Sequence, residues 1–504
     1  MTEPYLIGID SGTQSVRVMV FDQRGNIVST GVAQHAPYHS LQPGWAEQHP
    51  EDIWDKFCQA CRQAMSNMPA RAGRLLGAGL SAQRNTYVFA DADGRPLRPL
   101  ILWLDERQTA GLHPDPAWEP WLQQWQLCSK PNWVRVNQPD IHQKTRWYLP
   151  VSGWLTFRLT GELTDSLAMH VGRWPLDVDR LAFADAPAMY EALGISRDKL
   201  ASIQPPATVL GRVTREAAEQ TGLPVGLPIV ATAGDKQCET LGSGAITSGR
   251  AAVTYGTLAG LSNTIYDPIH AASGEYYLFP SAVSGAWNPE FQLVRGYWLV
   301  TWFREQFCRD LIAEGSRRGV PAEVLLNEEA AHIPPGADGL IIAPWWFCQT
   351  VSPNGKGAII GLDGVHTRAH LFRALVESIA FGLRPGLELF ARDQHTRVSE
   401  VMVGGGGAKS DLAMQTTADV FGLPAHRLHT VETCALGCAI DAAVATGLYG
   451  SFPDAVAQMT RTVRTFDPIP ENCATYDRLY TSVYSELYTT LENVFINLKT
   501  ITGR

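Results

Sequence analysis

Two alternating apolar runs joined by a short polar turn open the chain. Residues 5–22 read YLIGIDSGTQSVRVMVFD, and the alternation predicts a β-hairpin whose first strand ends at Asp10. Such a turn can present backbone N–H groups and hydroxyls to a phosphate, while the carboxylate holds a hydrated magnesium ion. No G-x-x-x-x-G-K-[ST] sequence occurs in the chain, so the pattern predicts ATP chemistry without a P-loop.

Further along the chain, similar strands are interleaved with helical periodicity. Apolar residues at helical spacing predict a helix near 51–66, and the run LLGAGLSA after it predicts a strand. The run PVGLPIVAT at 224–232 predicts a buried strand that leads into AGDKQCETLGSG. Residues 251–263, AAVTYGTLAGLSN, then repeat the order of strand, Gly-Thr turn and strand. The pattern therefore predicts two α/β halves, with the best boundary in GAITSGR at 244–250.

A long helix is predicted near 368–392 in the second half. It is followed by VMVGGGGAKSDLAMQTTADVFGLP and then by ETCALGCAIDAAVATGLY. The last segment carries Tyr476, Tyr480, Tyr484 and Tyr488 at a spacing of four residues. This stripe could form a binding ladder, but the spacing favours a terminal helix that packs on the body of the protein.

Composition limits the class of protein. The 504 residues are 45% hydrophobic and 18% charged, which predicts two or three domains of a well-packed protein. A formal net charge of −9 without a basic run argues against nucleic-acid binding. The chain contains no run of about 18 apolar residues, so we expect no membrane span. No signal-peptide pattern opens the chain. We therefore expect a cytoplasmic protein with neither a nucleic-acid nor a membrane partner.

The nine cysteines are scattered and odd in number, which fits a reducing compartment better than a disulfide framework. Cys58 and Cys61 form a C-x-x-C, but no second pair completes a zinc site. They share a helical stripe with Ile53, Phe57 and Met65. Burial on a helix face is therefore the favoured interpretation.

The two Gly-Thr turns form the first candidate site. An Asp-x-Gly-Thr hairpin alone is a moderate signal, because many hairpins carry Gly and Asp for their turn geometry. One such turn in each half could instead clamp a polyphosphate between domains. The residues are Asp10, Gly12, Thr13, Gln14 and Arg17 in the first half and Tyr255, Gly256 and Thr257 in the second.

A run of four glycines at 404–407, followed by Ala408, Lys409 and Ser410, forms the second candidate site. The run follows an apolar strand and opens a helix. Glycines let a flat ring or a phosphate approach the backbone, and a helix N-terminus favours negative charge. A flexible strand–helix turn is the alternative, and ligand contact is favoured. The run is not a dinucleotide fingerprint, because no acidic ribose partner stands out.

Two polar clusters complete the candidates. Asp235, in Gly234-Asp235-Lys236-Gln237, comes at a strand end and could accept a proton from an attacking alcohol, or simply cap a helix. Phosphoryl transfer needs positioning more than a strong base, so an ordinary carboxylate suffices. The other cluster offers bidentate polar groups and an aromatic platform for a polyhydroxylated ligand. It comprises Gln83, Arg84, Asn85, Trp103, Asp105 and Arg107.

These constellations, in this order, resemble the FGGY family of carbohydrate kinases. The resemblance spans nearly the whole chain through IGIDSGTQSVRVMVFD, GDKQCETLGSG, TYGTLAG, VGGGGAKSDLAMQTTADVFG and ETCALGCAIDAA. The segment GAIIGLDGVHTRAHLFRALVE also resembles the family's C-terminal pattern, with Gly361, Leu362, His370 and Glu377 at the expected places. The resemblance implies two ribonuclease-H-like domains of the actin-like ATPase type with an interdomain catalytic cleft. The domains would be 1–246, with the sugar site and catalytic Asp, and 247–504, with the nucleotide site.

The resemblance also implies roles for individual residues. Asp235 would be the general base, and Asp10 and Asp235 would hold Mg²⁺. Gln83, Arg84, Trp103, Asp105, Asp235 and Lys236 would bind the acceptor. Gly12, Thr13, Gln14, Arg17, Gly256 and Thr257 would contact the phosphates of ATP, and Gly405, Gly406 and Ser410 the adenosine.

Departures from the family concern the acceptor. Glycerol kinases carry Gln-Arg-Glu where this chain has Gln83-Arg84-Asn85, and Gln where it has Lys236. Xylulokinases carry Gln-Met-His-Gly at the first of these sites, which is absent here. Lys236 could contact an oxygen of the substrate, lower the pKa of Asp235, or point into solvent.

We therefore expect an ATP- and magnesium-dependent kinase for a hydroxyl of a small ketose or polyol. A kinase for a sugar acid or tetritol is the nearest alternative. A non-catalytic actin-like nucleotide switch and a degenerate sugar-sensing relative are alternatives of another class. A sugar pocket argues against the switch, and Asp10, Asp235 and both Gly-Thr turns argue against the sensor. The sequence gives neither the acceptor nor the oligomeric state, and the family suggests a homodimer.

Overall fold

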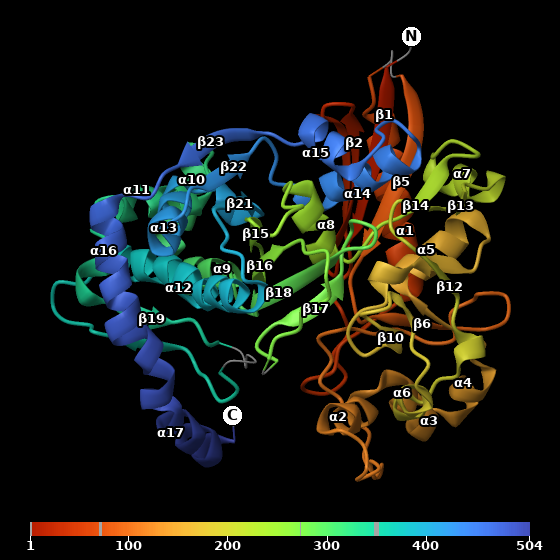
Figure 1. Ribbon diagram of the computed structural model, residues 1–504, viewed down its shortest axis with the longest axis horizontal. Coiled ribbons are helices and arrows are strands. Elements are labelled where there is room, and N and C mark those ends of the chain that lie inside the picture. Colours follow the sequence, from red (N-terminus) through yellow and green to blue (C-terminus); the bar gives the residue numbers. More distant parts are fainter. Residues whose placement is uncertain (1–2, 70–72, 273, 347–351, 504) are drawn as a thin grey trace. The chain divides into compact units, whose positions relative to one another are not determined.

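The computed structural model describes residues 3–69, 73–272, 274–346 and 352–503 (Figure 1). The chain folds into two compact units. Unit 1 comprises Met1–Gly242, Phe279–Trp287 and Thr433–Thr460, and unit 2 comprises Ser243–Leu278, Asn288–Glu432 and Arg461–Arg504. Unit 1 thus takes two segments from beyond residue 246, and the second of them, Thr433–Thr460, begins with the helix Thr433–Ala445.

Unit 1 is built on a six-stranded sheet in the order β13-β14-β5-β1-β2-β3. The hairpin predicted over residues 5–22 is β1 and β2, paired antiparallel from Tyr5–Asp22 to Ser11–Val16. Strands β5 and β14 run parallel to β1, so three carboxyl ends lie at one edge of the sheet. The bounds are β1 Pro4–Ser11, β2 Ser15–Asp22, β3 Ile27–Gln34, β5 Arg74–Ala82, β13 Val209–Arg212 and β14 Pro228–Ala231.

The principal helices of unit 1 are α1 Pro50–Ser66, α5 Val151–Thr160, α7 Arg215–Thr221, α8 Asp235–Gly242 and α14 Thr433–Ala445. Its further elements are β4 Glu47–Gln48, β6 Tyr87–Ala90, β7 Leu100–Ile101, β8 Trp147–Pro150, β9 Thr164–Ser166, β10 Leu176–Asp177, β11 Ala182–Phe183, β12 Ser202–Gln204, α2 Pro120–Cys128, α3 Lys130–Asn137, α4 Pro139–Lys144, α6 Pro187–Leu193 and α15 Phe452–Met459. Strand β14 is shorter than the predicted 224–232, because the chain turns before it, with Leu227 N–H donating to the Pro224 carbonyl at 3.2 Å.

Unit 2 contains a second sheet, in which β18, β16, β15, β21, β22 and β23 are successive neighbours. Their bounds are β15 Arg250–Tyr255, β16 Ala259–Asn263, β18 Trp287–Leu293, β21 Glu400–Gly404, β22 Ala425–Leu428 and β23 Thr462–Phe466. Strand β17, Tyr277–Pro280, includes the point where the chain passes from unit 2 to unit 1. The other elements are α9 Trp298–Phe307, α10 Arg309–Arg318, α11 Ala322–Ala330, β19 Ile341–Ala343, β20 Ala358–Ile360, α12 Arg368–Gln394, α13 Asp411–Phe421, α16 Pro470–Leu479 and α17 Ser485–Thr502.

The two sheets share one order and one set of strand directions. In unit 1, β1 pairs antiparallel with β2 and parallel with β5, and β5 pairs parallel with β14. In unit 2, β15 pairs antiparallel with β16 and parallel with β21, and β21 pairs parallel with β22. In unit 1, the outer strands β3 and β13 pair antiparallel with β2 and β14. In unit 2, β18 and β23 pair antiparallel with β16 and β22. The repeat predicted from the two Gly-Thr hairpins therefore extends over both sheets.

Two predictions of burial on a helix face are confirmed. Cys58 and Cys61 are buried in α1 within the core of unit 1, and the described cysteines are free thiols. Tyr476, Tyr480 and Tyr484 are buried in a hydrophobic cluster of unit 2, where Tyr480 and Tyr484 stack at 5.9 Å. The terminal tyrosine stripe is therefore part of a core.

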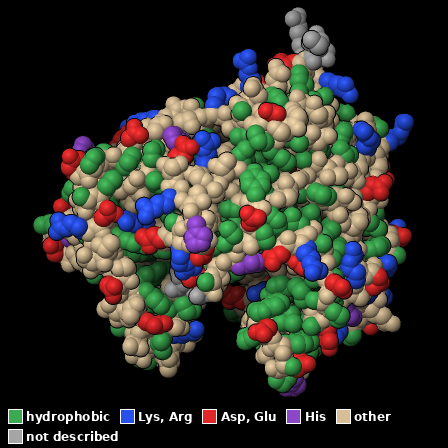
Figure 2. All heavy atoms as spheres, in the orientation of Figure 1, with side chains coloured by type: hydrophobic (Ala, Val, Ile, Leu, Met, Phe, Trp, Pro, Cys, Tyr) green, Lys and Arg blue, Asp and Glu red, His purple; other side chains and the backbone are tan. Residues whose placement is uncertain are grey.

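Charges of both signs are interspersed over the face of the molecule in Figure 2, as expected for a chain without a basic run. Within the described parts of the chain, no helix is long and apolar enough to cross a membrane.

Helix α14 makes backbone contact with its neighbours in unit 1, β1, β5 and α8 (Figure 1). A Cβ on Gly8 of β1 would lie 1.8 Å from the carbonyl oxygen of Ala435, and one on Gly79 of β5 would lie 2.0 Å from that of Cys438. A Cβ on Gly242 of α8 would lie 1.9 Å from a carbonyl oxygen at the start of α14. Because these distances leave no room for a methyl group, glycine is required at each position.

Replacement of Gly79 by alanine is expected to lower the free energy of unfolding by about 2 kcal/mol or more, because α14 must move away from the sheet. Gly364→Ala is the matched control, since no atom lies within 4 Å of the site of its Cβ. We expect it to change stability by at most about 0.5 kcal/mol. Denaturant unfolding of both variants measures the difference, and equal stability would contradict the packing argument.

Candidate active site

The carboxyl ends of three parallel strands bring the polar groups of unit 1 together. Asp10 lies beside Ser81 in the β1–β5 register, and Leu80 lies beside Ala231 in the β5–β14 register. Asp10 is thus at the end of β1, Gln83 and Arg84 follow β5, and Asp235 follows β14. Open α/β sheets bind ligands at this edge.

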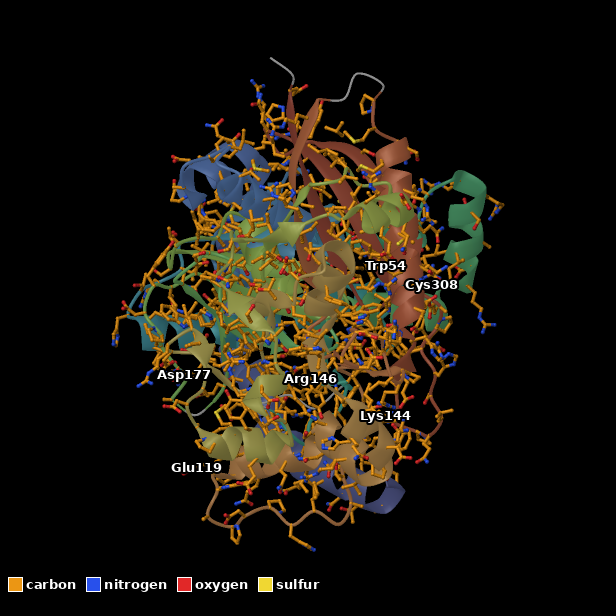
Figure 3. All side chains as sticks on the ribbon, turned by 90° about the vertical axis from the view of Figure 1, so that its right-hand side faces the viewer. Trp54, Glu119, Lys144, Arg146, Asp177 and Cys308 are labelled. Carbon is orange, nitrogen blue, oxygen red and sulfur yellow. The ribbon has the colours of Figure 1, made fainter. Side chains whose placement is uncertain are left out.

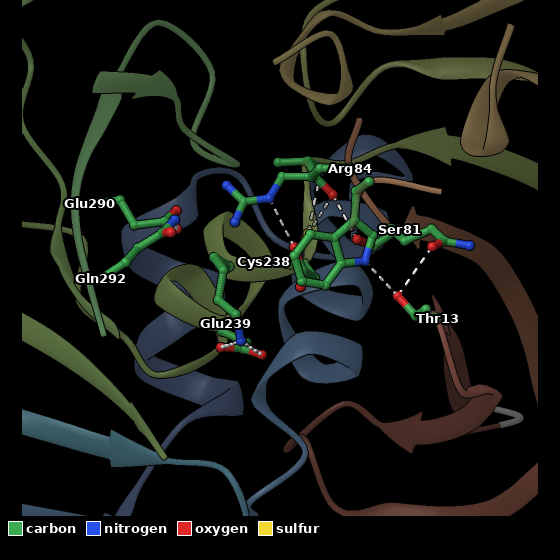
Figure 4. A network of polar contacts seen from close by, with 12 residues as sticks. Thr13, Ser81, Arg84, Cys238, Glu239, Glu290 and Gln292 are labelled. Carbon is green, nitrogen blue, oxygen red and sulfur yellow. Dashed lines mark hydrogen bonds and ion pairs between the residues drawn. The ribbon is translucent and has the colours of Figure 1, made fainter. Parts of the chain in front are cut away.

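Arg84 and Asp235 form the central ion pair of this edge (Figure 4), with Arg84 Nε 3.1 Å from Asp235 Oδ1. The Arg84 guanidinium also lies over the ring of Phe279, 5.0 Å from its centroid. A Cβ on Gly234 would lie 2.6 Å from Arg84 Cδ, so glycine at that position lets Arg84 reach the carboxylate. Asp235 is 34% exposed and begins α8, whose N-terminus favours a negative charge.

Asp10 is 16% exposed and lies 3.9 Å from Arg17, measured from Oδ2 to Nη1. The pKa of its carboxyl is raised to about 7, mainly by burial; the nearby charges of Asp235 and Glu239 contribute to the rise, while Arg17 and Lys236 oppose it. Three carboxylates therefore share the field of this edge. Without a nearby cation, keeping these three carboxylates charged costs free energy, because like charges repel one another.

The first Gly-Thr turn is tied to the residues after β5. Gly12 N–H closes the turn by donating to the Ser15 carbonyl at 3.0 Å. The Thr13 hydroxyl donates to Gln83 Oε1 at 3.1 Å and accepts from the indole N–H of Trp103 at 2.9 Å (Figure 4). Trp103 is 45% exposed. The structure thus brings together Thr13, Gln83 and Trp103, which the sequence assigned to two different candidate sites.

Asp105 has a different environment from the one predicted. Its side chain is fully buried, and Arg107 donates to both carboxylate oxygens at 2.7 Å. The backbone N–H of Ala46 donates to Oδ2 as well, at 2.6 Å. Arg107 in turn binds Glu47 and lies over Trp45. The carboxylate is therefore occupied by the protein, so Asp105 positions the loop that carries Trp103 and has no oxygen left for a ligand.

Lys236 does not point into solvent. It is 13% exposed, and its ammonium donates to both carboxylate oxygens of Glu239 at 2.8 and 2.9 Å. This pair fixes one face of the first turn of α8, beside Asp235. Gln14 and Arg17 are exposed, as is Trp103.

In unit 2, the second Gly-Thr turn lies next to the glycine run. Strands β15 and β21 are parallel neighbours, and Thr254 pairs with Gly404 at their carboxyl ends. Gly405 has φ +78°, and a Cβ there would lie 2.7 Å from the carbonyl oxygen of Tyr255. Nothing lies within 4 Å of a Cβ on Gly406. The turn of Gly256 and Thr257 therefore lies next to Gly405 and Gly406, which the sequence assigned to a separate candidate site.

Ser410 caps helix α13, because its hydroxyl oxygen accepts from Ala413 N–H at 3.1 Å. The same hydroxyl donates to Asn327 Oδ1 at 2.6 Å. The helix-cap interpretation and the ligand interpretation are thus compatible at this residue, since the cap places Ser410 and Asn327 side by side.

Ser410 and Asn327 both line a cavity of about 750 Å³ within unit 2, a size typical of sites for small molecules. Its lining is Val324, Asn327, Glu328, Ala331, His332, Ile333, Pro334, Pro335, Arg373, Lys409, Ser410, Asp411, Leu412, Gln415, Asp419 and Asn472. Most of these were not predicted, because they come from separate helices and carry no motif. Lys409 and Ser410 are the members that the glycine run pointed to.

Buried charges fix the wall of this cavity. Asp419 accepts from the side-chain amides of Gln415 and Asn472 at 2.9 and 2.8 Å. Gln415 donates its second N–H to the carbonyl of Asp467 at 2.9 Å, so only its carbonyl oxygen is left for a ligand. Arg373 is held by Glu377 at 2.6 Å, the glutamate of the segment 357–377.

Known proteins resemble the chain over its whole length. Residues 5–114 and 121–242 match the N-terminal domain of the FGGY family of carbohydrate kinases, and residues 251–446 match its C-terminal domain. A sugar kinase of Escherichia coli K12, YgcE, whose function is uncharacterized, is 33% identical over 97% of this chain and 94% of its own. The autoinducer-2 kinase of Yersinia enterocolitica is 30% identical over 97% and 96%, and the xylulose kinase of Bacillus subtilis 27% identical over 98% and 99%.

Solved structures have the same fold. Gluconate kinase from Lactobacillus acidophilus superposes with a TM-score of 0.82 at 21% identity, covering 99% of this chain and 100% of that one. Xylulose kinase from Rhodospirillum rubrum superposes with a TM-score of 0.81 at 24% identity, covering 97% and 99%. The resemblance stated from the motifs is confirmed, and with it a kinase that transfers phosphate from ATP to a carbohydrate hydroxyl. The chain belongs to the FGGY family of carbohydrate kinases.

Proposed function

We propose that Asp235 is the general base of this kinase and that the acceptor, a small sugar or polyol, binds at the strand-end edge of unit 1. The ion pair between Arg84 and Asp235 at the start of α8 is the observation that carries the proposal. The acceptor hydroxyl would donate its proton to an oxygen of Asp235 as the hydroxyl oxygen attacks the γ-phosphorus and the bond to the β,γ-bridging oxygen breaks, with ADP as the leaving group. Arg84 and the helix N-terminus keep the carboxylate charged and oriented, which suits a reaction that needs positioning.

The acceptor-binding residues of the proposal are Gln83, Arg84, Trp103 and Asp235. Trp103 offers an exposed ring beside Thr13, and rings of this kind pack on the C–H face of a sugar. Asp105 and Lys236 support the site from behind, since their charges are taken by Arg107 and Glu239. This assignment removes Asp105 and Lys236 from the predicted ligand contacts.

We assign the nucleotide to both Gly-Thr turns and to the cavity of unit 2. Gly12, Thr13, Gln14 and Arg17 would contact phosphate oxygens from unit 1, and Gly256 and Thr257 from unit 2. Gly405, Gly406 and Ser410 would contact adenosine. The carbonyl oxygen that Gln415 offers to the cavity favours a base with an exocyclic amino group, as adenine has.

Magnesium fits the carboxylates of unit 1. No cluster of three or more metal-ligating side chains forms a complete cage in the described residues, but Mg²⁺ is usually held by one or two carboxylates together with water and phosphate. Asp10 and Asp235 would hold it, and the bound ion would neutralise charge on the phosphates. Burial is the main cause of the raised pKa of Asp10, and a bound cation would offset that cost by pairing with the charged carboxylate.

The remaining proposals concern the domains, the cell compartment and the oligomeric state. We infer that residues 1–246 carry the acceptor site and residues 247–504 the nucleotide site, with the segment 433–460 serving unit 1 structurally. The free thiols of the described cysteines fit the cytoplasm. A homodimer remains an expectation from the family. Among the alternatives, membership in a family of kinases disfavours the nucleotide switch and the sugar sensor.

Asp235→Asn is expected to lower the acceptor-dependent release of ADP by about 10²–10⁴-fold, because the general base is lost while the shape is kept. Glu119→Gln is the control, an exposed carboxylate elsewhere in unit 1 (Figure 3), and should leave turnover unchanged. The measurement is coupled ADP release with a panel of ketoses, polyols and sugar acids. Release that needs no acceptor, or that survives in Asp235→Asn, would sink the proposal.

Asp10→Asn is expected to stabilise the metal-free protein, and to do so more strongly at high pH. The folded-state pKa of about 7 lies above the ordinary value of 3.8, so the stability that a protonated Asp10 contributes is lost as the pH rises from about 4 through 7. The variant avoids that loss, and we expect its advantage to be about 2 kcal/mol greater at pH 8 than at pH 5. Unfolding with a metal chelator at both pH values measures it. An advantage that does not change with pH would contradict the raised pKa.

A further inference from the structure

Resting on the proposed function, we propose that the acceptor is a polyhydroxy acid, whose carboxylate is bound near Asn85 by Lys130 and Arg173. The proposal concerns the far end of the acceptor, away from the hydroxyl that receives the phosphate. It follows from an excess of hydrogen-bond donors and positive charge next to Arg84.

Asn85 is the residue on which the neighbouring groups converge. Its backbone has φ +55°, in the left-handed region that few residues other than glycine adopt. Its side-chain Oδ1 accepts from Tyr87 OH at 3.1 Å and from the backbone N–H of Arg173 at 3.2 Å. Gly172 leaves room for this side chain, since a Cβ there would lie 2.4 Å from the Asn85 amide. With Oδ1 engaged, Asn85 offers its amide N–H groups as donors.

Lys130 is a buried cation without a carboxylate partner in the described chain. It is 8% exposed, its ammonium donates to the backbone carbonyl of Asn85, and it lies over the ring of Tyr87 at 5.3 Å. One bond to a carbonyl leaves two N–H donors of the ammonium unassigned. Burial, together with repulsion from Arg173, lowers its pKa to about 7. An anionic ligand would relieve this cost, because it would pair with the buried charge.

Arg173 adds a second cation at the same place. It is exposed, its backbone bonds to Asn85, and its charge acts on both Lys130 and Tyr87. The acidic group whose charge acts on Lys130 is Asp105, whose oxygens are occupied by Arg107. Asp235 is paired with Arg84. The carboxylates around Asn85 are therefore neutralised by other partners, and Lys130 and Arg173 remain in excess.

A neutral polyol and a carboxylate require different hydrogen-bonding groups around them. A hydroxyl group both donates and accepts, so polyol sites pair donors with acceptors such as carboxylates. A carboxylate only accepts, and it is bound best by charged donors. The wall next to Arg84 offers Asn85, Lys130 and Arg173 as donors, so it suits a carboxylate better than a neutral polyol.

The test compares matched acceptors with the full-length enzyme, Mg²⁺ and ATP. Erythronate, xylonate and gluconate are set against erythritol, xylitol and glucitol, so that each pair has the same number of carbons and differs in the carboxylate. Glycerol 3-phosphate represents a phosphate monoester, the other source of an oxyanion. We expect kcat/KM for at least one acid to exceed that of its polyol by about tenfold or more, with a KM that rises with salt for the acid alone.

Variants then assign the effect. Lys130→Met is expected to lower the ratio of kcat/KM for acid over polyol by about tenfold, mainly through KM, because a charge-assisted hydrogen bond is lost. Lys130→Arg, which keeps the charge, should restore much of the ratio. Lys144→Met is the control, an exposed lysine of unit 1 labelled in Figure 3, and should leave the ratio unchanged.

Three outcomes would overturn the proposal. The first is that the enzyme prefers the polyol over its acid at every chain length. The second is that it prefers the phosphate monoester. The third is a Lys130→Met variant that lowers turnover of acid and polyol equally, which would indicate a structural role. Failure of the proposed function looks different, since no acceptor in the panel would then elicit ADP release that depends on Asp235.

Discussion

Close packing of α14 on glycines is the constraint on which the acceptor edge of unit 1 depends. The helix touches β1 at Gly8, β5 at Gly79 and α8 at Gly242, at distances that exclude a methyl group. It thereby fixes the two parallel strands whose ends carry Asp10 and Arg84, and the helix that begins at Asp235. Because packed interiors transmit strain, a shift of α14 at these contacts would alter the ion pair between Arg84 and Asp235.

The repeated sheet explains why the site residues occur where they do. The loop after β5 carries Gln83 and Arg84, and the equivalent loop after β21 carries the glycine run. The loop after β14 leads to Asp235, and the one after β22 leads to α14. One topology therefore supplies both an edge rich in charged side chains and an edge of bare backbone, and the difference between them lies in the loops. Asp10 illustrates this, because Thr254 stands at the corresponding place in unit 2, where there is no carboxylate.

Much of the fold could be predicted, because the strands and helices have clear periodicity and the Gly-Thr turns have a definite geometry. The hairpin of β1 and β2, helix α1 and the burial of Tyr476 follow from local pattern alone. The role of Asp105 could not be predicted, since Arg107 and Ala46 reach its oxygens through tertiary contacts. The same holds for the cavity of unit 2, whose Asn327 comes from a helix with no motif.

The negative charges at the strand-end edge of unit 1 must be paired with cations before a further anion can approach that edge. Burial and the charges of Asp235 and Glu239 raise the pKa of Asp10, and Arg17 and Lys236 offset only part of that rise. A polyphosphate contacting Thr13 and Arg17 would bring more negative charge to the same edge. A divalent cation would offset both the cost of charging Asp10 and the negative charge of the polyphosphate, because it pairs with the carboxylate of Asp10 and with phosphate oxygens. In the proposed mechanism the metal would let the anionic donor approach the anionic base, in addition to neutralising charge on the phosphates.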